Sequence, residues 1–76
     1  MKTLIKNDDQ WWELMEDASG RWWLEVVCGG AGMYEVKFRL TRKEEAACRK
    51  SPAALPRLVR KVQRHPREFL KRGKRR

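Results

Sequence analysis

Histidine and cysteine are scarce in this chain of 76 residues, which contains a single histidine, His65, and two cysteines, Cys28 and Cys48. A catalytic nucleophile needs a neighbouring base, and a structural zinc ion needs four ligands, most of them drawn from these residue types. We therefore expect a protein that is not an enzyme and that carries no metal and no cofactor. The cysteines are expected to be buried, reduced thiols.

Long apolar runs are missing as well. The chain has no stretch near the roughly 20 apolar residues that a membrane-spanning helix requires. Its first residues, MKTLIKNDD, hold two adjacent large apolar residues and then charges, which is not the apolar core of a signal peptide. The sequence thus predicts a cytoplasmic protein.

Acidic residues are unevenly distributed, and the second half of the chain has few of them. Residues 1–40 contain five basic and seven acidic side chains, whereas residues 41–76 contain fourteen basic and three acidic ones. The net charge of +9 therefore comes from the C-terminal half. Such an asymmetry indicates a polyanionic partner, most often nucleic acid or an anionic membrane surface.

Three segments have the composition of β-strands: residues 10–16 (QWWELME), 21–28 (RWWLEVVC) and 33–40 (MYEVKFRL). They are rich in aromatic and β-branched residues, and short loops that contain glycine separate them. In the third segment the apolar residues recur at every second position, which is the period of a half-buried strand. The order of these segments predicts a three-stranded antiparallel meander.

The loops predict how the strands pair. A three-residue hairpin loop favours glycine at its last position, as in residues 18–20 (ASG) and 30–32 (GAG). On the core face this register pairs Trp12 with Val26, Leu14 with Leu24, Val26 with Val36, Leu24 with Phe38 and Trp22 with Leu40. On the other face it pairs Glu13 with Glu25, Glu25 with Lys37, and Trp23 with Arg39. The two glutamates repel each other, so Lys37 is expected to relieve them, and Trp23 with Arg39 offers a cation–π contact.

Helices are expected in the C-terminal half. Thr41 and Glu44 form a capping box that predicts a helix over residues 42–50, with a short apolar face that packs weakly. A second helix should begin at residues 54–56. Its apolar stripe consists of Leu55, Leu58, Val59 and Val62. Pro66 should interrupt this helix, and Phe69 and Leu70 should continue the stripe for a further turn.

These elements predict the α+β class: a three-stranded antiparallel β-meander followed by one or two C-terminal helices packed on one sheet face. Residues 1–70 form a single small domain in this prediction. Residues 71–76 (KRGKRR) are expected to be a basic disordered tail, because a run of like charges without apolar residues has nothing to pack.

The basic residues of the second helix recur on the side opposite its apolar stripe, and no acidic residue occurs between Glu45 and Glu68. Charged helix faces are commonly just solvated, but ordinary surfaces mix the two signs of charge. A face of one sign can neutralise several phosphates at once. The candidate residues for binding nucleic acid or another anion are Arg57, Arg60, Lys61, Arg64, Arg67, Lys71, Arg72, Lys74, Arg75 and Arg76.

Two Trp-Trp doublets form the second candidate site. Because adjacent strand residues point to opposite faces, each doublet sends one indole inward and one outward. The outward side predicts an apolar interface that consists of Trp11, Trp23, Met15 and Val27, with Met33 beside them. This interface would serve a homodimer, a partner protein or the stacking of bases. In the alternative, Leu4 and Ile5 fold back and cover it.

The leading prediction is a small basic nucleic-acid-binding or nucleic-acid-associated accessory protein that contacts phosphates through its C-terminal helix and tail. The alternative is a protein–protein interaction module of the inhibitor, antitoxin or immunity type that docks its basic surface on an acidic partner protein. A homodimer through the outer sheet face is compatible with both. Membrane binding ranks last, because the apolar residues that would insert are expected in the core.

Overall fold

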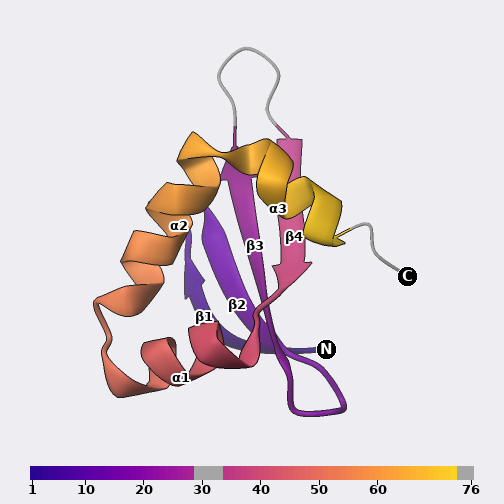
Figure 1. The fold of residues 1–76 in the computed structure, drawn as a ribbon, viewed down its shortest axis with the longest axis vertical. Helices are drawn as coiled ribbons and strands as arrows, with labels where there is room; N and C mark the ends of the chain where they lie inside the picture. The colour runs from indigo at the N-terminus through magenta and orange to yellow at the C-terminus, as the bar shows by residue number, and fades with distance from the viewer. Residues whose placement is uncertain (29–33, 74–76) are drawn as a thin grey trace.

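The computed structural model describes residues 1–28 and 34–73. Within these ranges the chain forms the strands β1 (Lys2–Asn7), β2 (Trp12–Glu16), β3 (Trp22–Cys28) and β4 (Tyr34–Arg39), then the helices α1 (Arg42–Lys50), α2 (Ala54–Arg64) and α3 (Pro66–Gly73). The strands make one antiparallel sheet in the order β1-β2-β3-β4. The helices lie on one side of this sheet, where α2 packs against β3 and α3 against β4 (Figure 1).

The α+β class is confirmed, but the predicted number of elements is wrong. In the described ranges the sheet has four strands instead of three, and three helices follow instead of one or two. The additional strand, β1, lacks simple alternation because its register with β2 shifts between Thr3 and Ile5. This bulge lets Leu4 pack against the core while its neighbour Ile5 pairs with the buried Leu14. Leu4 and Ile5 therefore extend the sheet and do not cover its outer face.

The predicted pairing of the other strands is confirmed. Leu24 lies between Leu14 and Phe38, as the hairpin loops indicate. Glu13 and Glu25 also lie opposite each other, with Lys37 beside Glu25 and Lys6 of β1 beside Glu13. The outer face thus carries two glutamates flanked by two lysines, which reduce the repulsion between the carboxylates. Burial and the charges of Glu35 and Glu13 nevertheless raise the pKa of Glu25, against the effect of Lys37. The loop predicted at residues 30–32 and Met33 lie outside the described residues.

The core lies between the sheet and the helices. Leu24, Val36 and Phe38 are fully buried, as predicted, and the ring of Phe38 packs against that of Phe69 with 4.7 Å between centroids. The prediction that Trp22 is buried to the same degree is wrong, because it lies at the start of β3 and keeps part of its surface exposed. The guanidinium of Arg49 covers its ring at 4.4 Å from the centroid, a cation–π contact.

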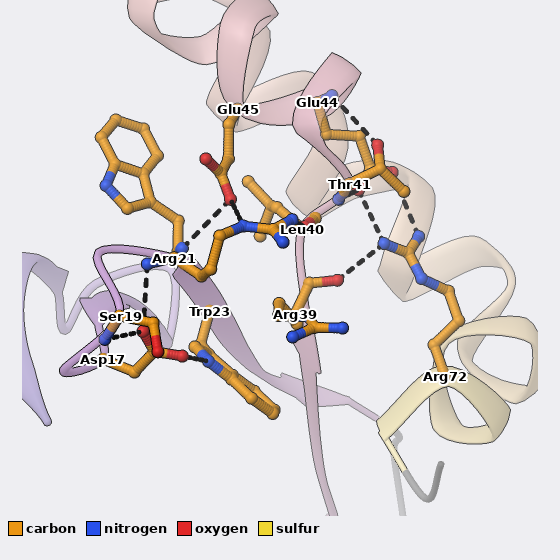
Figure 2. A network of polar contacts seen from close by, with 11 residues as sticks. Asp17, Ser19, Arg21, Trp23, Arg39, Leu40, Thr41, Glu44, Glu45 and Arg72 are labelled. Carbon is orange, nitrogen blue, oxygen red and sulfur yellow. Dashed lines mark hydrogen bonds and ion pairs between the residues drawn. The ribbon is translucent and has the colours of Figure 1, made fainter. Parts of the chain in front are cut away.

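Helix α1 has the predicted bounds and capping box, but it is attached to the sheet by charge. Its Ala46 and Ala47 are exposed, whereas Glu45 is buried. The Oε2 atom of Glu45 accepts hydrogen bonds from Arg21 Nε at 2.8 Å and from the Trp22 amide at 3.2 Å (Figure 2). Burial opposes the charge on Glu45, but these bonds and the positive charge of Arg21 outweigh it and lower the pKa of the carboxyl.

Helix α3 continues to Gly73, so the basic tail does not begin at Lys71 as predicted. The reason is Arg72, whose Nη1 and Nη2 atoms donate to both carboxylate oxygens of Glu44, at 3.1 and 2.7 Å (Figure 2). Its Nη2 also donates to the Arg39 carbonyl at 2.8 Å, and its guanidinium lies 4.7 Å from the ring centroid of Phe38. These contacts hold the last turn of α3 on the domain. Residues 74–76 lie outside the described part of the chain.

The first testable prediction concerns the core. Phe38→Ala removes a fully buried ring that contacts both Phe69 and Arg72. It should lower the free energy of unfolding by about 3–5 kcal/mol, a large part of the stability of a domain of this size. Urea unfolding followed by tryptophan fluorescence measures the change. Lys37→Ala, at the exposed neighbouring position, is the control, and an equal loss in both variants would contradict this core.

A second prediction concerns pH. Because the pKa of Glu45 is lower in the folded state, its ion pair stabilises the protein fully above the unfolded-state pKa of about 4.3, and this contribution is lost as the pH falls through the folded-state pKa. Glu45→Gln leaves Arg21 without its carboxylate partner and should cost about 3 kcal/mol at pH 7. The gap to wild type should shrink at pH 3.5. A gap that is the same at both pH values would show that the charge of Glu45 is not what matters.

Candidate functional site

The basic face of α2 is present as the helical spacing predicts. Arg57, Arg60, Lys61 and Arg64 are exposed, whereas Leu55, Val59 and Val62 on the other side are buried. The four basic side chains line one shallow hollow together with His65. Among the residues that the structure describes, none of these four forms an ion pair. We define the basic face by these four residues.

The other candidate anion-binding residues are divided between two environments. Arg67 and Lys71 are exposed on α3, four positions apart and so on the same side of the helix. Arg72 is not free, because its guanidinium is held by Glu44, by the Arg39 carbonyl and by the aromatic rings beneath it. Lys74, Arg75 and Arg76 lie outside the described residues.

Trp11 has an unusual backbone conformation. It lies in the connection between β1 and β2 with a φ of 61°, in the left-handed region that bulky residues avoid. This conformation costs roughly 1–2 kcal/mol in a residue with a side chain. It is held in place by the Trp11 carbonyl, which accepts a hydrogen bond from the Val27 amide at 2.9 Å, and by the pairing of Trp12 that follows it. The indole is 50% exposed.

The position of Trp11 differs from the sequence-based expectation. It lines a hollow on the outer sheet face, and it also lines a second hollow that reaches α2. The residues around this second hollow, which we call the Trp11–α2 hollow, are Asp9, Gln10, Trp11, Val27, Pro56, Val59, Arg60 and Gln63. Arg60 belongs to this hollow and to the basic face. The fold therefore joins an exposed indole to the basic helix.

The outer sheet face exposes less apolar surface than the sequence suggests. Met15 is buried to 8% exposure, because β1 adds a strand beside β2 and places Thr3 next to it. Trp23 is half-buried, and its Nε1 donates to Asp17 Oδ2 at 2.9 Å, a bond that lowers the pKa of this carboxyl. Val27 is half-buried as well. Of the four predicted interface residues, Trp11 is the exposed one.

Metal ligation, the cysteines and membrane crossing can each be examined in the described ranges. Residues 1–28 and 34–73 contain no cluster of three or more His, Cys, Asp or Glu side chains placed to hold a metal ion. Both cysteines are free thiols, and burial raises the pKa of each of them. Within the same ranges, no helix has the length and apolar character needed to cross a membrane.

Sequence reasoning missed the Trp11–α2 hollow and the internal role of Arg72. The turn-forming residues Asn7, Asp8 and Asp9 signal a loop before Trp11, and the side chain of Asn7 does accept from the Gln10 amide at 2.9 Å. Nothing in the sequence signals a left-handed tryptophan, because that conformation is imposed by the strands around it.

Comparison of this chain with protein-family models, with curated proteins and with solved structures finds no match.

A third prediction tests the strain at Trp11. Trp11→Gly removes the indole and also the steric cost of the left-handed backbone, whereas Trp11→Ala removes the indole and keeps that cost. We expect Trp11→Gly to be at least as stable as Trp11→Ala, with a difference of up to about 1 kcal/mol in the free energy of unfolding. Thermal and urea unfolding of the two variants measure it. A glycine variant that is clearly the less stable of the two would contradict the left-handed conformation.

Proposed function

We propose that this protein binds nucleic acid through the basic face of α2. The observation that carries the proposal is the basic face itself: four exposed cations on one side of a helix, with no ion-pair partner among the described residues. Since Arg57, Arg60, Lys61 and Arg64 recur every three or four positions, their charges lie along one line on the helix. A row of cations along one line suits a phosphate backbone.

The distribution of acidic residues supports the same proposal. Helix α2 contains no acidic residue at all. Glu44 and Glu45 form ion pairs with Arg72 and Arg21, which offset their negative charge. The exposed Glu68 of α3 lies against His65 at the edge of the basic face. Glu13 and Glu25 alternate along their strands with the buried Leu14 and Leu24, so they lie on the sheet face away from the core. The protein therefore presents a positive side at α2, and nucleic acid is expected to approach from that side.

In this proposal the basic face contacts phosphates and Arg67 and Lys71 extend the contact along α3. Arg72 is left out, because its guanidinium holds α3 on Glu44. Lys74, Arg75 and Arg76 enter the proposal only as three further positive charges in the sequence, which add to the attraction for a polyanion. The protein acts here as a binding protein and needs no cofactor.

The fourth prediction follows from phosphate contacts. Each neutralised phosphate of duplex DNA contributes about 0.9 to the slope of log K against log salt, so four to six contacts give a slope of roughly −3.5 to −5.5. Reversing Arg60 and Arg64 to Glu should nearly abolish binding. The matched control is the reversal of Arg42 and Lys43 to Glu, which changes the charge equally on the exposed start of α1 and should weaken binding far less. Fluorescence anisotropy with labelled duplex DNA, single-stranded DNA and RNA measures the affinity of wild type and of both double variants, and the salt slope of wild type.

The three nucleic acids are compared at about 0.1 M salt, where non-specific complexes have dissociation constants of roughly 10⁻⁴–10⁻⁶ M. Deletion of residues 74–76 should flatten the salt slope and leave the fold intact, whereas a deletion that includes Arg72 should also destabilise the domain. If folded wild-type protein binds none of the three nucleic acids, the proposal is wrong, and an acidic protein partner becomes the better explanation of the basic face.

A further inference from the structure

We propose that the Trp11–α2 hollow receives an unpaired base, so that the nucleic acid bound on α2 is single-stranded. This inference rests on the proposed function and adds the class of nucleic acid to it. It starts from an arrangement that only the fold creates: an exposed indole from the β1–β2 connection beside the basic helix.

Arg60 joins the two parts of the proposed site. Its side chain lines the Trp11–α2 hollow and also the hollow of the basic face, next to Arg57, Lys61 and Arg64. A strand whose phosphates lie along the basic face therefore passes the mouth of the Trp11–α2 hollow. A base that leaves the strand at Arg60 meets the side chain of Trp11, which lines the same hollow. Stacking platforms beside a basic groove are the usual means by which proteins hold single strands without sequence preference.

The lining of the hollow combines an aromatic and several apolar side chains with two amides and the carboxylate of Asp9, groups that can stack on a base or hydrogen-bond its edge. Trp11 offers an exposed aromatic face, and Val27, Pro56 and Val59 add apolar surface. Gln10 and Gln63 supply side-chain amides, which carry both donors and acceptors and so match the edge of any base. The Oε1 atom of Gln10 accepts from Trp12 Nε1 at 3.3 Å, an interaction that directs the amide and leaves its NH₂ group to donate.

The conformation of Trp11 also favours a single strand. The left-handed backbone, held by the Val27 amide, sets the direction in which the Trp11 side chain leaves the main chain, so the backbone loses little freedom when the indole stacks. Strain of this kind is typical of binding and catalytic positions. Bases in a duplex are stacked on each other and reach a concave hollow only after they swing out of the helix, which requires unpairing. An unpaired strand has no such cost.

The experiment measures binding by fluorescence anisotropy at about 0.1 M salt with three labelled ligands of equal length. They are a single strand of thymidines, the same strand with some of its bases removed, and the duplex of the intact strand with its complement. Wild type should bind the single strand more tightly than the duplex. Trp11→Gly should lower affinity for the single strand by roughly 5- to 100-fold and leave duplex binding and the salt slope unchanged. Trp11→Phe should restore most of the affinity. The abasic strand should bind wild type as weakly as the normal strand binds Trp11→Gly, because each lacks one half of the stack.

The outcomes separate this inference from the proposed function. If single strand and duplex bind equally, and Trp11→Gly changes neither while reversal of Arg60 and Arg64 abolishes both, the base site is wrong and the phosphate site stands. If Trp11→Gly weakens both ligands to the same degree, the indole does not stack on an unpaired base, and the inference is overturned. If no nucleic acid binds to the folded protein, both proposals fall. Trp23→Phe, a change in a half-buried indole on the outer sheet face, is the control and should behave as wild type.

Discussion

The arrangement of the helices depends on two adjacent carboxylates, those of Glu44 and Glu45 (Figure 2). Glu45 bonds to Arg21 and to the Trp22 amide, while Glu44 caps its own helix at Thr41 and holds Arg72 of α3. Such charge-assisted bonds are about twice as strong as neutral ones, which matters in a helix whose apolar face is short. These bonds fix α1 and the end of α3, while α2 packs on the sheet through its buried Leu55, Val59 and Val62.

The arginines of this chain have two distinct roles. Arg21, Arg49 and Arg72 are used internally, on carboxylates, backbone carbonyls and aromatic rings. Arg57, Arg60 and Arg64 lie exposed along α2. Glu44 and Glu45 are paired with Arg72 and Arg21, whereas the exposed Glu68 of α3 contacts His65. In the described ranges, the arginines of α2 form no ion pair. With few carboxylates in its second half, the domain thus combines internal ion pairs with a helix face that carries only positive charge.

Trp11 connects the fold to the proposed base site. Its left-handed backbone conformation has a steric cost in free energy. The hydrogen bond from the Val27 amide and the pairing of β2 with β3 hold the backbone in that conformation. The side chain that results lies half-exposed beside α2 rather than in the core. Residues that keep a strained conformation at the surface are expected where binding, not stability, requires them.

The sequence by itself determined the class of the fold, the faces and register of β2, β3 and β4, the bounds of α1 and the two sides of α2. All of these follow from local rules: alternation, glycine at hairpin loops, a capping box and helical spacing. The tertiary structure alone decided the addition of β1, the internal role of Arg72 and the place of Trp11 next to Arg60. A bulge hides the pattern of β1, and the other two arise from contacts between residues distant in the chain. Local patterns carry no information about which distant groups will meet, because that choice is made by the packing of the whole domain.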